Sequence, residues 1–410
     1  MSKWREYIPP AVIVGGAGYF VDIFDLFLFV VHRIASISEI TRGEDSVSHA
    51  VGLLNTQMVA LIIGGFFWGV LSDKIGRKKT LYGSILLYSL ATLCNGLITS
   101  IPQYYICRAL AGFGLAGELG IAVTLVTESM KPGKRGHGVY IMAGFGLCGG
   151  LFAGLTEHFL TWRQSFFLGG ALGILILILR IRVDESVVFL KYIEQNQKQA
   201  RKSSITVVQR FYNSFIRLHK EDVRLLFLVT LIGMPIYYIS SVFIFFAPEL
   251  AREIGVTDPI SAGQAITYSY AGTVSGDFFF GFLSQKLKSR FVPVKIGLLL
   301  AGSSSLFVLL YPISSAPVYT FMCLFVGFCA GYWVVLLTAI AEVTATGRRG
   351  TVTTTAPNLV RATTIPLTLT WAALQNVWDK KTGAIFLALI VFPIAWWAIN
   401  RMDDPFEREL

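Results

Sequence analysis

Charge is what this 410-residue sequence lacks most. Only 15% of its residues are Asp, Glu, Lys or Arg, whereas a soluble globular chain carries about 25%. Residues 84–100, 138–154 and 384–400 are almost free of charge, and each is close to the ~20 apolar residues needed to cross ~30 Å of hydrocarbon. The sequence therefore predicts a polytopic membrane protein, not a soluble one with a large buried core.

Other absences exclude classes of function. No G-x-x-x-x-G-K-[ST] phosphate loop occurs in the sequence, which argues against an ATP-driven pump. No convergent nucleophile and base is found, so an enzyme is not expected. The five cysteines and five histidines have no metal-ligand or disulfide-framework spacing, so no metal site is expected. We expect no cofactor, and a proton gradient as the energy source.

The basic residues are distributed unevenly along the chain. The net charge of +10 would suggest nucleic acid as a partner in a soluble protein, but no basic patch lies on a foldable soluble domain. With the N-terminus placed in the cytoplasm, 27 of the 35 Lys and Arg residues fall in inner segments and six in outer loops. By the positive-inside rule this predicts two cytoplasmic termini, in a bacterial inner membrane. The expected partners are the bilayer and a small-molecule substrate, and a monomer is expected.

Apolar runs separated by charged or turn-forming clusters predict twelve transmembrane helices. Their approximate ranges are 10–32, 51–72, 80–98, 103–128, 138–158, 164–182, 223–246, 263–284, 293–311, 316–341, 351–374 and 382–400. The longest polar stretch lies between the sixth and seventh runs. The predicted organisation is therefore an all-α membrane protein with a six-helix bundle in 1–182, a basic cytoplasmic linker in 183–222 and a second bundle in 223–410.

An internal repeat supports two related halves. The segment 69–79 reads GVLSDKIGRKK after the second run, and 281–290 reads GFLSQKLKSR after the eighth. Glu128 precedes Arg135 by seven positions after the fourth run, and Glu342 precedes Arg349 by the same offset after the tenth. Parallel repeats of this kind are known in transporters.

The segment 69–79 matches, position by position, the loop signature G-x-L-[AS]-D-[RK]-x-G-R-[RK]-[RK] of the Major Facilitator Superfamily, which the whole two-half chain resembles. The resemblance implies two pseudo-symmetric six-helix bundles and transport by alternating access.

The signature also suggests an ion-pair latch between the halves. Gly69 permits close helix approach and Gly76 a sharp turn. The carboxylate of Asp73 can reach Arg77 or basic residues after the fourth run, and such a contact could hold one access state. The alternative is that these charges only anchor the topology. The candidate latch residues are Gly69, Asp73, Gly76, Arg77, Glu128 and Arg135.

A narrower resemblance rests on three segments. The fourth run reads RALAGFGLAGELGIAVTLVTE over 108–128, the sixth exits through DESVVFL at 184–190, and the first carries DIFD at 22–25. Together they resemble the metabolite:proton, aromatic-acid:proton and organic-ion branches of the superfamily. The sequence departs from those branches at Val187, where a proline is usual, and between the two aspartates, where a glycine is usual. The Gly-Pro motif of drug antiporters is absent from the fifth run.

Several charges lie inside the predicted helices, where each costs at least ~2.5–3.5 kcal/mol unless it has a partner, water or a function. Asp22 is about 18 Å into its helix, and Asp25 lies one turn further on nearly the same face. Either could carry the coupled proton, or could form a fixed ion pair with Arg108 or another cation. Because the resemblance places the first and fourth helices at the cavity, Glu118 is expected nearby as a second proton site or a structural hydrogen-bonding residue.

Arg361 lies near mid-membrane in the eleventh run, with no acidic residue within one turn. Its forked guanidinium suits a substrate carboxylate or phosphate, and a basic residue on this helix favours anions in the organic-ion transporters it resembles. The alternative is a salt bridge to Asp277 in the eighth run. Most membrane aromatics are packing residues, but Tyr237, Tyr238 and Trp333 are candidate pocket walls.

These observations favour a secondary active transporter that takes up a small organic anion or metabolite with protons. The alternatives are an exporter of an amphiphile, such as a lysolipid or drug, and a transport-inactive membrane sensor.

Overall fold

The structure, a computed structural model, describes residues 9–42, 46–130, 134–180, 185–186, 190–191, 194, 219–375 and 377–406. Over these residues the chain is helical and contains no strand. The first half consists of α2 (Pro10–Thr41), α3 (Ser46–Ile75), α4 (Arg77–Asn95), α5 (Ile101–Leu115) continued by α6 (Glu118–Ser129), α7 (Arg135–Phe159) and α8 (Trp162–Arg180).

The second half repeats this order. It consists of α11 (Lys220–Ile239) continued by the π-helix η1 (Ser240–Phe245), the short α12 (Ala247–Glu253), α13 (Ala262–Leu287), α14 (Phe291–Leu310), α15 (Ala316–Ala330) continued by α16 (Trp333–Val343), α17 (Thr346–Ala362) continued by α18 (Thr364–Leu374), and α19 (Lys380–Ile399). The predicted all-α two-bundle fold is confirmed, with six helical columns in each half. Most of the expected linker, 183–222, lies outside the described residues, so the domain boundaries stay predictions.

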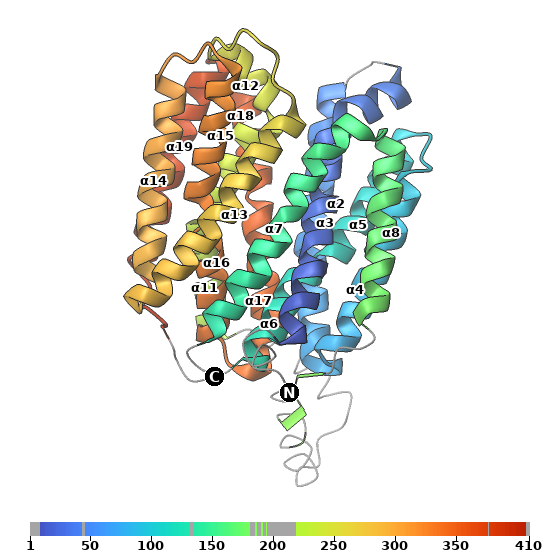
Figure 1. The fold of residues 1–410 in the computed structure, drawn as a ribbon, viewed down its shortest axis with the longest axis vertical. Coiled ribbons are helices and arrows are strands. Elements are labelled where there is room, and N and C mark those ends of the chain that lie inside the picture. Colours follow the sequence, from blue (N-terminus) through green and yellow to red (C-terminus); the bar gives the residue numbers. More distant parts are fainter. Residues whose placement is uncertain are drawn as a thin grey trace.

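Nine of the described helices or continuous helix pairs are long and apolar enough to cross a membrane. The three remaining columns, α4, α13 and α17–α18, are more polar, and they stand among the others in the same bundle (Figure 1). Part of the signature loop begins α4, and α17 carries Arg361.

Glycine and proline explain where helices break. Between α15 and α16, a Cβ on Gly331 would lie only 2.3 Å from the backbone carbon of Gly276 in α13, so only glycine permits this approach. Pro235 inside α11 cannot donate a backbone hydrogen bond, and the column then widens into the π-helix η1. Short π-helical turns occur frequently at functional sites.

The two halves meet along two pairs of helices. Column α7 packs along α13, and α3 packs along α17. In Figure 1, α7 leans across to α13 between the orange and the blue-green halves. The helix α2 begins and α19 ends at the same end of the bundle (Figure 1), which we call the inner end, and the opposite end the outer end.

Candidate functional site

An ion pair joins the halves at the centre of the bundle. Nη2 of Arg361 in α17 donates to Oδ2 of Asp22 in α2 at 2.7 Å, and Nη1 lies 3.4 Å from Oδ1. Both side chains are almost completely buried. The forked contact neutralises two charges that would be costly apart, and it ties the first helix of one half to the eleventh column.

A cavity lies beside this pair. It is small in this closed arrangement, about 30 Å³, and is lined from both halves, by Tyr19, Ile23, Leu147, Ile236, Tyr237, Ile239, Ser240, Ile244, Ser269, Tyr270, Thr273, Gly327, Ala330 and Trp333. Trp333 Nε1 donates to the hydroxyl of Tyr19 at 3.3 Å, and Tyr19 precedes Asp22 by one helical turn. The hydroxyl of Tyr237 also interacts with the guanidinium of Arg361. Aromatic walls with a few hydroxyls are what a small polar organic ligand requires.

Of the three aromatic residues expected in the pocket, Tyr237 and Trp333 line it and Tyr238 does not. The hydroxyl of Tyr238 donates to the carbonyl of Ala384 in α19 at 2.8 Å, and its ring packs against Phe392. Consecutive residues point about 100° apart on a helix, so the two tyrosines face different neighbours. The assignment of Tyr238 to the pocket is corrected accordingly. Tyr19 and Tyr270 take wall positions that sequence reasoning missed, although the one-turn spacing from Asp22 could have indicated Tyr19.

Asp25 makes a separate contact within the first half. Thr92 Oγ1 donates to Asp25 Oδ1 at 2.6 Å, and Arg108 Nη1 lies 3.8 Å from Oδ2. The guanidinium of Arg108 also lies 5.0 Å from the ring centre of Phe166. All three polar side chains are fully buried. Asp22 and Asp25 therefore have different cations, one across the half–half boundary and one inside the first half.

Glu118 begins α6, at the break in the fourth column. It accepts two hydrogen bonds from Arg180 at the end of α8, one of them to Oε2 at 3.1 Å. The carbonyl of Arg180 in turn accepts from the hydroxyl of Tyr82. Glu118 therefore has a cationic partner at the end of the sixth helix, which sequence reasoning had not proposed.

The alternative partner considered for Arg361 was Asp277, and the contact is not formed. Asp277 is completely buried in α13, and within the described part of the chain no ion pair reaches it.

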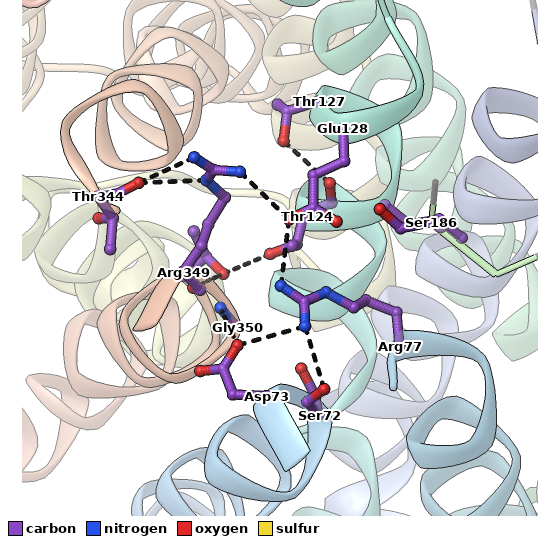
Figure 2. A network of polar contacts seen from close by, with 12 residues as sticks. Ser72, Asp73, Arg77, Thr124, Thr127, Glu128, Ser186, Thr344, Arg349 and Gly350 are labelled. Atoms are coloured by element: carbon purple, nitrogen blue, oxygen red, sulfur yellow. Dashed lines mark hydrogen bonds and ion pairs between the residues drawn. The ribbon is translucent and has the colours of Figure 1, made fainter. Parts of the chain in front are cut away.

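The signature loop crosses to the other half at the inner end. Asp73 accepts hydrogen bonds from the backbone N–H of Gly350 at 3.0 Å and from the N–H and hydroxyl of Thr351 at 2.8 and 2.7 Å. Arg77 lies 3.4 Å from the same carboxylate. Figure 2 shows Asp73 of α3 reaching toward Gly350 of α17. The carboxylate of Asp73 thus contacts Arg77 and the start of α17, the eleventh column. Within the described part of the chain it does not contact the basic residues after the fourth run, which were the other partners expected from the sequence.

Glu128 extends this network. One carboxylate oxygen accepts from Arg77 of its own half and from Arg349 of the other, both at 3.1 Å (Figure 2). The second half repeats the arrangement: Glu342 accepts from Arg290 at 2.6 and 2.8 Å and also interacts with Arg135 of the first half. We call the contacts of Asp73, Arg77, Glu128 and Arg349, with their counterparts in the second half, the inner network.

Two glycines fit this geometry. A Cβ on Gly69 would lie 2.8 Å from the Cα of Thr351 in α17, closer than real Cβ atoms approach. Gly76 has a φ of 103°, a conformation that glycine adopts readily and other residues rarely. Sequence reasoning missed Glu185, which accepts from the backbone N–H groups of Arg77 and Lys78 and so caps the start of α4.

The halves also touch at the outer end. Arg33 of α2 pairs with Glu249 of α12 at 3.2 Å, and its guanidinium stacks over Phe245 of η1 at 4.1 Å. The hydroxyl of Ser261 donates to Glu157 of α7 at 2.7 Å. Polar contacts between the halves therefore lie on both sides of the central cavity. Among the described residues no group of three or more His, Cys, Asp or Glu could hold a metal ion.

Comparisons with known proteins agree with this geometry. The model of the Major Facilitator Superfamily matches residues 16–362. The chain is 28% identical over 305 residues to the sialic acid transporter NanX of Escherichia coli (strain K12), covering 71% of this chain and 70% of that protein. It is 28% identical over 183 residues to the niacin transporter NiaP of Acinetobacter baylyi, covering 43% of this chain and 40% of that protein.

Two solved structures share the fold. The proton:xylose symporter XylE superposes with a TM-score of 0.73 at 16% identity, covering 98% of both chains. The human organic anion transporter MFSD10 superposes with a TM-score of 0.74 at 14% identity, covering 95% of this chain and all of that one.

Proposed function

Because the chain belongs to the Major Facilitator Superfamily, we propose that this transporter takes up a small organic carboxylate together with protons by alternating access. The observation that carries the proposal is the forked, buried pair of Asp22 and Arg361 beside a cavity lined by both halves.

The pair supplies a binding group and a proton acceptor in one contact. Arg361 stays charged at any physiological pH, and its fork matches a carboxylate. While Asp22 occupies it, the guanidinium has no room for a substrate. When Asp22 takes up a proton, it loses its charge and its hold on Arg361, and a substrate carboxylate can replace it.

The charges balance at each stage of this exchange. In the empty site, Asp22 and Arg361 together carry no net charge. With Asp22 protonated and a monocarboxylate on Arg361, the net charge is again zero, so the loaded centre avoids the cost of an unpaired charge in a low-dielectric site. Proton without anion, or anion without proton, leaves one unpaired charge. That penalty is the physical basis of coupling.

Asp25 does not carry the coupled proton in this scheme. Its 3.8 Å separation from Arg108 is longer than a direct hydrogen bond, so its pairing is looser than that of Asp22. We assign it a supporting role in the same half, with Glu118 held by Arg180 as a structural residue.

The contacts at the two ends fit alternating access. The inner network must break for the cavity to open toward the inner end. The Arg33–Glu249 pair must break for the cavity to open toward the outer end. We propose that the inner network is the latch predicted from the signature loop. The opposite end would then admit substrate, with the inner end facing the cytoplasm.

Two relatives favour a carboxylate. Their names state sialic acid and niacin as substrates, and both compounds are carboxylic acids. Their carbon skeletons differ greatly, so the carboxyl group is the feature that a shared cationic site would recognise.

The test is a thermal-shift comparison of acids with their neutral analogues on the purified protein. Niacin and nicotinamide differ only at the carboxyl group, as do sialic acid and its methyl ester. The acid of at least one pair should raise the melting temperature, the neutral analogue should not, and Arg361→Ala should lose the shift. Equal stabilisation by an acid and its amide or ester would count against the carboxylate site.

A further inference from the structure

Asp277 differs from the other carboxylates buried among the helices. Each of the other buried carboxylates of the described residues contacts an arginine, in the pairs Asp22–Arg361, Asp25–Arg108, Glu118–Arg180, Glu128–Arg349, Glu342–Arg290 and Asp222–Arg348. Asp277 is equally buried, with 0% exposure, yet neither of its oxygens has a hydrogen-bond partner of normal geometry in the described part of the chain.

The surroundings of Asp277 supply no compensating charge. The backbone N–H of Val334, in the first turn of α16, points toward it. The helices that pack against α13 carry the titratable residues Tyr140 of α7, Lys295 of α14 and Cys329 of α15, with Tyr332 before α16, and among the described residues none of these bonds the carboxylate of Asp277. The helix α2 also packs there, and its Asp22 and Asp25 are paired with arginines. The hydroxyl of Tyr332 instead donates to the carbonyl of Ile232.

An ionised carboxylate in this position would be expensive. A charge at membrane depth costs at least ~2.5–3.5 kcal/mol even when some water or lipid relaxation is allowed. One N–H at a helix start offsets part of this cost, since that end of a helix favours negative charge by ~0.3–1 kcal/mol, or ~2 in favourable buried geometry. The balance favours the neutral acid while the site is closed.

Asp277 also lies close to residues that line the cavity. It follows Thr273, which lines the cavity, by one turn of α13. Its contact Val334 is adjacent to Trp333, which also lines the cavity and hydrogen-bonds Tyr19. Gly331, at the break between α15 and α16, packs closely on the backbone of Gly276 and Asp277, so the break lies next to the residue that carries this carboxyl group.

From this geometry we propose that Asp277 is a second proton-binding site, in the half opposite to Asp22. In the closed state it holds a proton. When the break between α15 and α16 moves and water reaches it, the carboxyl group releases that proton, and the N–H of Val334 and the start of α16 then stabilise the anion. The inference rests on the proposed proton-coupled function, because it gives that cycle a second carrier.

Infrared difference spectroscopy of the purified protein tests this without any substrate. At neutral pH the wild type should show a carboxylic-acid C=O stretching band that Asp277→Asn lacks. Asp258→Asn, in an exposed outer loop, is the matched control and should keep the band. Because asparagine resembles the neutral acid in size and polarity, Asp277→Asn should fold with a melting temperature close to that of the wild type.

Two results would overturn the inference. If wild type and Asp277→Asn have the same acid band, Asp277 is ionised in the closed state and only caps α16. If the band persists to the highest pH at which the protein remains folded, the carboxyl group never releases its proton and is a structural acid. Neither result depends on transport, so each can be told apart from failure of the carboxylate-uptake proposal, which the acid and amide comparison decides.

Discussion

Arg361 and Asp22 lie 339 positions apart in the chain and meet through a forked contact whose shorter hydrogen bond is 2.7 Å. The pair crosses the boundary between the halves at the level of the central cavity. Any movement that separates the first helix from the eleventh column must therefore break it or replace one partner. This relationship gives the proposed transport cycle its chemical step.

The pair should show strong coupling in stability. Asp22→Asn or Arg361→Ala alone leaves one buried group unmatched, which costs about 3–5 kcal/mol when a buried pair is broken. The double variant removes both charges and should cost much less than the sum. Thermal unfolding of the four proteins measures this. Glu39→Gln, in the exposed pair with Arg163, is the control and should change stability by only about 0–1 kcal/mol. Additive losses would mean that the two residues do not depend on each other.

Asp73→Asn should loosen the inner end. Its carboxylate accepts three hydrogen bonds from Gly350 and Thr351, and hydrogen bonds to charged groups contribute about 1.5–3 kcal/mol each. Loss of even one such contribution shifts the access equilibrium about tenfold or more. Thr124→Cys, made after the five native cysteines are replaced, reports this because residue 124 is buried between the halves.

A water-soluble thiol reagent should label the cysteine at position 124 faster when Asp73→Asn is added to the Thr124→Cys protein. Adding the control Asp258→Asn should leave the labelling rate unchanged. An unchanged labelling rate in an active Asp73→Asn protein would leave the signature loop as a topology anchor only.

Gly69→Ala should open the same end by a different route. The added Cβ would lie 2.8 Å from the Cα of Thr351, and backbone atoms cannot move aside cheaply. Overpacking of this kind costs about 1–3 kcal/mol, and here it destabilises the state in which the inner end is closed. Gly383→Ala is the matched control, because its nearest neighbour is at an ordinary 3.4 Å. The cysteine at position 124 should react faster with the thiol reagent in Gly69→Ala and at an unchanged rate in Gly383→Ala. Equal rates in both variants would show that the close approach of α3 and α17 is not required.

Asp404 should give a pH-dependent contribution to stability at the inner end. Partial burial raises the pKa of its carboxyl, but hydrogen bonds from Ser289 and from the backbone N–H of Arg290 and Phe291 outweigh burial and hold the pKa below its usual range. A depressed pKa means that the stabilisation is complete above the unfolded value of about 3.9. It is lost as the pH falls through the lower, folded value.

The melting temperature of the wild type should therefore exceed that of Asp404→Asn above about pH 4, and the difference should vanish in more acidic buffer. Asp403→Asn removes the neighbouring exposed charge and serves as the control. A difference that stays constant through the acidic range would show that the carboxylate charge does not hold the start of α14.

The sequence predicted the columns of this fold well because lipid imposes long apolar runs, and charge between the runs is easily seen. It also predicted the loop signature and placed Asp22, Asp25 and Arg361 at membrane depth. The ion pair with Arg108 that it offered as an alternative is the one that Asp25 makes, but it did not predict that Asp22 would pair with Arg361. Asp277 and Asp22 were both acidic residues at comparable depth, and only the crossing of the helices brings Asp22 to Arg361.

Local geometry accounts for the remaining differences. The rotation of about 100° per residue separates Tyr237, which faces the cavity, from Tyr238, which faces α19. Arg180 ends the sixth helix, and its side chain turns to Glu118 in the fourth column. Sequence spacing alone does not determine which neighbours these side chains contact, since that depends on how the adjacent helical columns are placed.

The central claim is that a substrate carboxylate and a proton on Asp22 replace the Asp22–Arg361 contact together. The most direct measurement follows transport by Asp22→Asn protein reconstituted in vesicles. The probe is a radiolabelled form of the acid that the thermal-shift comparison identifies. Exchange of labelled for unlabelled acid across the membrane should persist, because asparagine imitates the protonated state, while accumulation driven by an imposed pH gradient should be lost. Accumulation by Asp22→Asn at the wild-type level would contradict the account.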